Sequence, residues 1–163
     1  MSGRFARLVA GVALAGAAAM AVAALAQAAG ARINTTRSVP LGLYWVSDAA
    51  AEKGAYVLVC PPQGPVFDEA RARGYIGAGF CAGGYGYLIK RIAATGGDAV
   101  AVSEAGVRVN GALLALSAPR TVDAGGRALP GFRRDATVLG AGEVLLMADA
   151  SPTSFDARYF GPV

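Results

Sequence analysis

The chain has 163 residues, which is enough for one domain plus an N-terminal segment, and 55% of them are hydrophobic. It contains no histidine, which excludes Ser-His and Cys-His nucleophile systems and zinc sites that use imidazole. The net charge is +4, but the arginines are scattered and form no run of the kind that binds nucleic acid. We therefore expect no nucleic-acid partner.

An uncharged stretch from Leu8 to Gly30 is long enough to span a bilayer as a helix. Two arginines precede it, so the positive-inside rule predicts a cytoplasmic N-terminus and an exported remainder. We favour a retained membrane anchor in residues 1–31. The alternative is a secretory signal that is cleaved, because Ala24-Leu25-Ala26 offers a small-residue cleavage pattern. In either case residues 32–163 are the predicted exported domain.

The exported part is predicted to be mainly β, with little helix. Short strands rich in aromatic and β-branched residues are expected at Leu43–Val46, Tyr56–Val59, Tyr87–Ile92, Ala99–Val102, Val107–Val109 and Glu143–Ala148. Asn110-Gly111 is the strongest hairpin signal, because both residues tolerate the positive φ of a type I′ turn. We expect a polar crossing at 32–37, one or two helical turns near 68–73, and loops at 117–136 and 149–163.

The two cysteines, Cys60 and Cys81, flank a stretch rich in glycine and proline and poor in core-forming residues. In an exported domain an even cysteine count favours a disulfide. The alternative is a pair of free, buried thiols. Their spacing does not fit a CxxC redox site.

Of the two lysines, Lys53 lies in a polar link and is expected at the surface, whereas Lys90 lies in the apolar run Tyr87–Ile92. Burial disfavours a charged amine and can lower its pKa to about 7–8, where it can take a proton from a serine hydroxyl. Ser38, shortly after the apolar segment, is the matching serine. Alternatively, Lys90 extends from an edge strand to solvent.

Three segments, Ser38–Tyr44 (SVPLGLY), Lys90–Asp98 (KRIAATGGD) and Ser154–Gly161 (SFDARYFG), resemble in order and spacing the motifs of the Ser/Lys signal peptidases. The Ser-x-Pro-x-Gly-x-Tyr form is most similar to the conjugative-transfer, TraF-type branch, whose members mature pilin precursors. The resemblance covers nearly the whole chain. It implies a signal-peptidase-like catalytic domain, a β-barrel or sheet, after one N-terminal transmembrane helix.

The resemblance also implies roles for individual residues. Ser38 matches the nucleophile and Lys90 the general base. Thr36 matches the position whose hydroxyl stabilises the oxyanion beside the backbone N–H of Ser38. Ser154 matches the residue that orients the lysine amine.

Supporting roles are implied for Asp98, in the tight turn after the lysine strand, and for Asp156 with Arg158, as an ion pair behind the dyad. Ala157 departs from the family pattern, which commonly reads Asp-Ser-Arg at this point. Family members usually continue past the Gly-Pro pair with another strand, whereas this sequence ends at Val163. We therefore expect either a fragment or a sheet that closes differently.

The predicted function is that of a serine endopeptidase at the bacterial cytoplasmic membrane, with its catalytic domain on the periplasmic face and no need for a metal or cofactor. Its predicted substrate is an exported precursor protein, with a pilin precursor of conjugative transfer favoured and the product left open as linear or cyclic. The alternatives are a general signal peptidase and a non-catalytic, anchored scaffold of a pilus or secretion complex. A self-cleaving repressor is disfavoured because no helix-turn-helix precedes the β domain.

Overall fold

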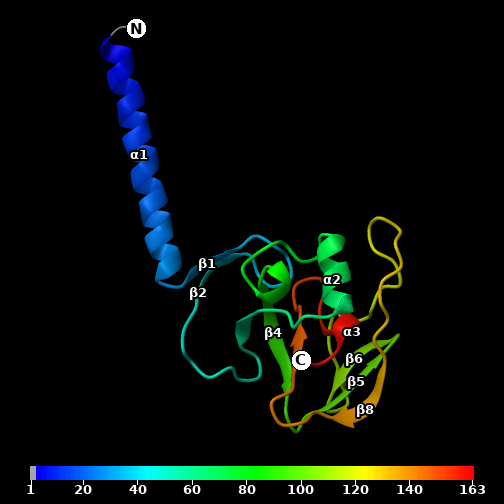
Figure 1. Cartoon of the computed structure of the whole chain (residues 1–163). Coiled ribbons are helices and arrows are strands. Elements are labelled where there is room, and N and C mark those ends of the chain that lie inside the picture. Colours follow the sequence, from blue (N-terminus) through cyan, green and yellow to red (C-terminus); the bar gives the residue numbers. More distant parts are fainter. Residues whose placement is uncertain (1–2) are drawn as a thin grey trace. The chain divides into compact units, whose positions relative to one another are not determined.

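The computed structural model describes residues 3–163, which form two compact units. One unit contains residues 3–34 and 42–48, and the other contains residues 35–41 and 49–163. The structure is mainly β with one long N-terminal apolar helix, as the sequence predicts (Figure 1).

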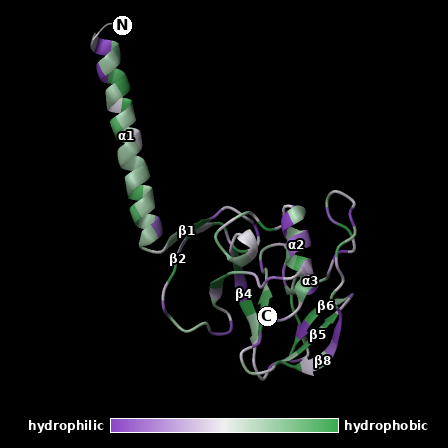
Figure 2. Ribbon diagram, in the orientation of Figure 1, coloured by the Kyte–Doolittle hydropathy of each residue, from purple (hydrophilic) through white to green (hydrophobic). Residues whose placement is uncertain are grey.

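The first unit consists of helix α1 (Gly3–Ala28) and a hairpin of β1 (Ala31–Asn34) and β2 (Gly42–Trp45). The helix is apolar along most of its length and long enough to cross a membrane (Figure 2). The sequence predicts an irregular polar segment at 32–37. This prediction is wrong for residues 32–34, which belong to strand β1 and pair with β2. With only four residues and one strong β-former, Ile33, this strand gives little signal of its own.

In the second unit, a three-stranded antiparallel sheet has the order β3 (Tyr56–Val59), β4 (Leu88–Thr95), β9 (Val144–Met147). Side chains alternate along a strand, and Lys90, Ile92 and Ala94 all lie on the buried face of the central strand β4. Lys90 is therefore not on an edge strand, and its side chain points into the protein.

A four-stranded antiparallel sheet has the order β7 (Ala112–Leu113), β6 (Gly106–Val109), β5 (Ala99–Ser103), β8 (Arg134–Val138). Asn110 and Gly111 have φ values of 50° and 82°, so they make the turn that the sequence predicts. Strand β8 begins inside the stretch expected to be loop. It adds to the outer side of β5, and this pairing is non-local.

Helix α2 (Pro65–Ala72), a 3₁₀ turn (Ala82–Gly84) and the one-turn helix α3 (Ala157–Phe160) complete the second unit. Buried aromatic side chains join α2, the glycine-rich loop and the C-terminal segment, among them Phe67, Tyr85, Phe155 and Tyr159. Helix α3 lies where a loop was expected. A single turn is too short to show helical periodicity, and it starts because the Asp156 side chain accepts a hydrogen bond from the backbone N–H of Arg158.

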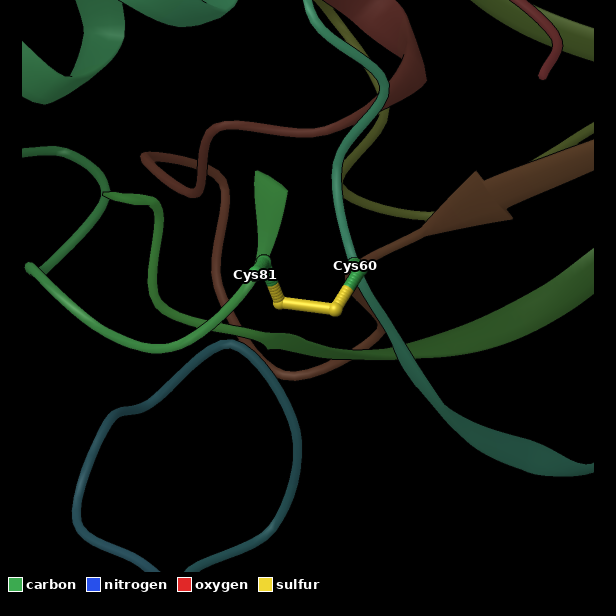
Figure 3. Close-up of a disulfide and its surroundings, with 2 residues drawn as sticks. All are labelled: Cys60 and Cys81. Atoms are coloured by element: carbon green, nitrogen blue, oxygen red, sulfur yellow. A yellow bond between two sulfur atoms is a disulfide. The ribbon is translucent and has the colours of Figure 1, made fainter. Parts of the chain in front are cut away.

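Cys60 and Cys81 form the predicted disulfide, which ties the end of β3 to the glycine-rich loop (Figure 3). The bridge joins residues 21 positions apart and encloses α2. It therefore restrains the chain on the way into β4, the strand that carries Lys90.

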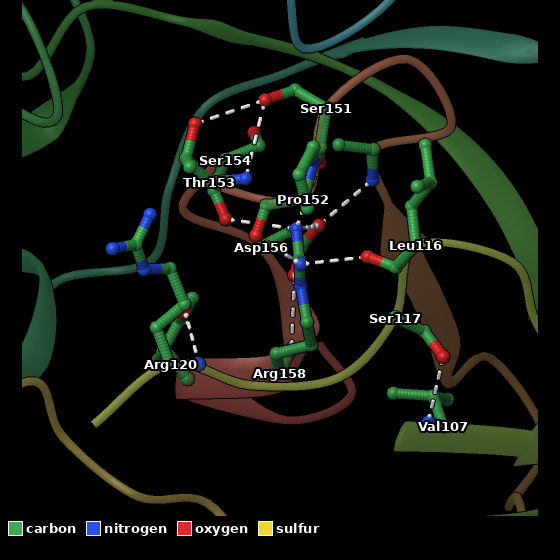
Figure 4. A network of polar contacts seen from close by, with 12 residues as sticks. Val107, Leu116, Ser117, Arg120, Ser151, Pro152, Thr153, Ser154, Asp156 and Arg158 are labelled. Atoms are coloured by element: carbon green, nitrogen blue, oxygen red, sulfur yellow. Dashed lines mark hydrogen bonds and ion pairs between the residues drawn. The ribbon is translucent and has the colours of Figure 1, made fainter. Parts of the chain in front are cut away.

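Arg158 is fully buried and organises the C-terminal loop (Figure 4). Its guanidinium forms a two-pronged ion pair with Asp156, with Nε and Nη2 each 2.7 Å from a carboxylate oxygen. The remaining N–H groups donate to the backbone carbonyls of Leu116, Ser151, Pro152 and Ser154. Asp156 also accepts from the backbone N–H of Ala148, so the pair links the loop to the end of β9.

Removing the disulfide should destabilise the second unit. The chain-entropy model gives about 3 kcal/mol for a loop of roughly 20 residues. We expect the double variant Cys60→Ser/Cys81→Ser, and reduced wild-type protein, to lose about this much in urea unfolding of the full chain in detergent. Reductant should not change the double variant further. Alkylatable thiols in the folded, non-reduced wild type would contradict the pairing.

Replacing Arg158 should be much more costly than replacing an exposed arginine. Arg158→Leu leaves the Asp156 carboxylate buried and unpaired, and breaking a buried pair in this way costs about 3–5 kcal/mol. Arg133→Ala is the control, because the Arg133–Glu104 pair is exposed and 3.8 Å apart, and such pairs contribute about 1 kcal/mol or less. Equal urea midpoints for the two variants would contradict this account.

Candidate active site

The Lys90 side chain is only 2% exposed. It lies on the central strand β4, opposite Val57 of β3. Its amine donates a hydrogen bond of 2.7 Å to the hydroxyl of Ser154. Lys90 is therefore buried, as its place in an apolar run of the sequence predicts.

Ser154 is the side chain that connects Lys90 with Ser38. Its Oγ lies 2.7 Å from Lys90 Nζ and 2.8 Å from Ser38 Oγ. Ser154 is itself buried, and its backbone carbonyl accepts a hydrogen bond from Arg158. The structure thus brings three residues from distant parts of the sequence into one hydrogen-bonded row, Ser38, Ser154 and Lys90.

Ser38 lies in the turn at residues 35–41, which belongs to the second unit. The residue is half-buried, and its hydroxyl contacts that of Ser154. The next residue, Val39, has no exposed surface at all. Burial of this branched side chain fixes the turn and hence the position of the Ser38 hydroxyl.

Burial lowers the pKa of Lys90 from its ordinary value of 10.5 to about 8. The Asp156 carboxylate opposes this shift and the Arg158 guanidinium adds to it. At pH 7 an amine with a pKa of about 8 is neutral in about one molecule in ten, against about one in 3,000 at the ordinary value. The site therefore raises the supply of neutral amine by a factor of several hundred.

Thr36 and Asp98, the other two residues with predicted roles, lie in two different turns. Thr36 lies two residues before Ser38 in the same turn and is exposed, and its predicted role at the oxyanion stays a prediction. Asp98 lies in the turn beyond the far end of β4, and the five residue-to-residue steps from Lys90 to Thr95 alone cover about 17 Å of strand. Asp98 is therefore not part of the hydrogen-bonded row.

Asp98 instead holds a turn together. Its carboxylate accepts hydrogen bonds from the backbone N–H of Thr95 and from the side chains of Lys53 and Asn110. These bonds lower the pKa of Asp98 to about 2, and the bond from the Thr95 N–H makes the largest contribution. Lys53 is half exposed in this pair, as expected of a surface lysine. Within residues 3–163, no cluster of three or more potential metal-ligating side chains is found.

Sequence reasoning missed two contributions to the site. Val39 was not singled out, although a branched apolar residue directly after a candidate nucleophile is a usable signal for an anchored turn. The carbonyls that accept from Arg158, such as that of Leu116, carry no signal in the sequence, because every residue has one.

Comparison with known proteins bears on this geometry. Residues 4–163 match the family described as signal peptidase, peptidase S26. Two Escherichia coli proteins called plasmid transfer protein TraF are 61% and 58% identical to the chain, over 100% and 98% of it and 92% and 90% of their own lengths. A conjugal transfer protein TraF of Agrobacterium fabrum is 35% identical over 95% of this chain and 84% of its own. No solved structure gives a significant match.

The family match spans all three motifs, and the TraF relatives align over almost the entire chain. Each residue of the hydrogen-bonded row, Ser38, Ser154 and Lys90, comes from a different one of the three motifs. The chain therefore belongs to signal peptidase family S26 and, within it, to the TraF branch of conjugative-transfer proteins.

Proposed function

We propose that the protein is a serine endopeptidase that uses Ser38 as nucleophile and Lys90 as general base. The observation that carries this proposal is the buried Lys90 amine, joined to the Ser38 hydroxyl through Ser154 by bonds of 2.7 and 2.8 Å. The Ser154 bond would satisfy a buried lysine of any kind, but a lysine kept for structure alone would not need the further contact of Ser154 with the half-buried Ser38.

In the proposed mechanism, neutral Lys90 removes the proton of the Ser38 hydroxyl, with Ser154 orienting the amine or relaying the proton. Ser38 Oγ attacks the scissile carbonyl, and the backbone N–H of Ser38 and the Thr36 hydroxyl stabilise the oxyanion. Protonated Lys90 then gives its proton to the leaving amine, which breaks the peptide bond and leaves an ester on Ser38. Attack by water gives a linear product, and attack by an amine of the same chain gives a cyclic one.

We propose that the substrate is a precursor protein of the conjugation apparatus, most simply a pilin precursor. The names of the TraF relatives, which describe plasmid and conjugal transfer, support this choice over a general signal peptidase. The proposed arrangement is residues 1–31 as membrane anchor and residues 32–163 as a domain on the periplasmic face. The apolar helix α1, with arginines only near its start, supports this orientation.

The dyad proposal is tested by incubating the full-length protein in detergent with a candidate pilin precursor. Ser38→Ala, Lys90→Ala and Lys90→Arg should each lower cleavage by about 10⁴-fold, since arginine keeps its proton at any working pH. Ser154→Ala should cost about 10²-fold, because the base remains but is poorly oriented. Mass spectrometry identifies the product, since a cyclic form is lighter than the linear one by one water.

Lys53→Ala is the matched control, because it removes the other lysine of the chain from an exposed ion pair. It should keep wild-type activity. If folded Lys90→Arg processed the precursor at more than a small fraction of the wild-type rate, the Ser/Lys mechanism would be wrong, and a non-catalytic scaffold would become the better description.

The pH dependence should follow Lys90. The amine must be neutral to act as a base, so activity should rise with pH, with its acidic limb centred near the folded pKa of about 8. Stability should change in the same direction for a related reason. Between about pH 8 and 10.5 the Lys90 amine is protonated in the unfolded chain and neutral in the folded protein. Because the unfolded state binds more protons there, the free energy of unfolding rises with pH across this window.

Lys90→Met provides the control for both pH measurements, because it keeps an unbranched chain of similar length without the amine. It should be inactive and should lose the rise in unfolding free energy between pH 8 and 10.5. An acidic limb far below pH 8 in the wild type, or an unchanged stability profile in the variant, would argue against a titrating Lys90.

A further inference from the structure

Arg37, which directly precedes Ser38, is exposed. Most arginines of the second unit use the guanidinium in an ion pair or in a hydrogen bond to a backbone carbonyl: Arg71, Arg73, Arg91, Arg108, Arg127, Arg133 and Arg158. Among the residues that the structure describes, the Arg37 guanidinium makes neither kind of contact. The same holds for Arg120 and Arg134, but neither of them adjoins a residue of the hydrogen-bonded row in the sequence.

The turn that carries Arg37 is fixed although the guanidinium is not. The Ser38 hydroxyl contacts that of Ser154 at 2.8 Å, and Val39 has no exposed surface. A fixed backbone presents the arginine at a defined place beside the nucleophile. A group bound there orders one side chain and no loop, which keeps the entropic cost of binding low.

The charges of the site favour an anion. Asp156 and Arg158 neutralise each other as a buried pair 2.7 Å apart. The segments 35–41 and 150–155, which supply the two serines of the hydrogen-bonded row, contain no acidic residue. When Lys90 is neutral, as the proposed mechanism requires, the cation before the nucleophile therefore remains as the net charge. A positive charge at a site attracts groups of opposite sign, and the attraction strengthens when a bound ligand displaces water.

We propose that Arg37 selects the substrate by binding the carboxylate of an Asp or Glu close to the scissile bond. The inference rests on the proposed peptidase function and names the class of precursor that its site prefers. A guanidinium suits this task, because it binds a carboxylate through two parallel hydrogen bonds.

The position of Arg37 limits where that acidic residue lies. Its Cα is about 3.8 Å from that of Ser38, and an extended peptide advances about 3.3 Å per residue. With the scissile carbonyl at the Ser38 hydroxyl, substrate residues within about three positions of the cleaved bond are therefore in reach of the arginine side chain.

An anionic lipid headgroup is a poorer occupant of this place. A phosphate held by Arg37 would fill the space beside the nucleophile that the scissile peptide bond has to enter. A carboxylate of the substrate arrives together with that bond and leaves with the products.

The test uses the full-length protein in detergent and a candidate pilin precursor, whose cleavage site is located by mass spectrometry. That site should have an Asp or Glu within about three positions. Arg37→Glu should lower kcat/KM by about 10- to 100-fold, because repulsion replaces a charge-assisted hydrogen bond. Arg37→Lys should lower it less, since it keeps the charge but loses the fork. With the acidic residue of the precursor changed to lysine, Arg37→Glu should cleave faster than the wild type.

Arg108→Glu is the matched control. It makes the same change of charge at another exposed arginine, whose guanidinium donates to the carbonyl of Gly111. The neighbouring Asn110 contacts Asp98, which lies beyond the far end of β4 and away from Lys90. Arg108→Glu should therefore cleave both precursors as the wild type does.

Three results would overturn the inference. The first is an equal fall in kcat/KM for the acidic and the lysine-bearing precursor, which means that Arg37 acts on the fold or on Ser38 instead of on the substrate. The second is a cleavage site without an acidic residue within about three positions. The third is an effect of Arg37→Glu that ignores the charge of the precursor and appears only with phosphatidylglycerol vesicles, which means a lipid headgroup at Arg37.

Binding measured without cleavage separates this outcome from that of the peptidase proposal. Fluorescence anisotropy of the labelled precursor gives its Kd for Ser38→Ala and for Ser38→Ala/Arg37→Glu. A Kd that is about tenfold higher for the double variant, together with a wild type that cleaves no precursor, refutes only the peptidase. Cleavage by the wild type together with equal Kd values refutes only the role of Arg37.

Discussion

The burial of the Lys90 amine against a serine hydroxyl is the interaction on which the second unit depends. An amine that is 2% exposed has lost its hydration, and burying such a group is costly unless it is hydrogen-bonded. The Ser154 hydroxyl provides that bond at 2.7 Å. Because a hydrogen bond weakens within a few tenths of an ångström, Ser154 has to be held rigidly although it lies in a loop.

The Asp156–Arg158 pair supplies that rigidity. A buried ion pair is stabilising only if its remaining polar atoms are satisfied, and here the guanidinium donates to four backbone carbonyls besides the carboxylate. One of these carbonyls belongs to Ser154 itself. The same two charges act on Lys90, so the group that fixes the loop also adjusts the pKa of the amine. Structure and proposed chemistry are therefore coupled through one network.

Local sequence signals predicted the elements that depend on local interactions. The turn at Asn110 and Gly111 and the strand Tyr56–Val59 were predicted correctly, because positive φ and β-branched runs are properties of the residues themselves. Strand β1 and part of β8 were missed, since their pairing partners supply most of their stabilisation. Helix α3 was missed because a single turn formed by the Asp156 cap is invisible to periodicity.

The sequence by itself determined the available chemistry: the absence of histidine, the lysine in an apolar run, the serine after the apolar segment, and the family to which the three motifs are similar. Tertiary structure decided which groups meet. Ser154 is 64 residues from Lys90 and 116 from Ser38, whereas Asp98, only eight residues from Lys90, is directed to another turn. Residue type fixes what a side chain can do, but contacts over such separations depend on the path of the whole chain.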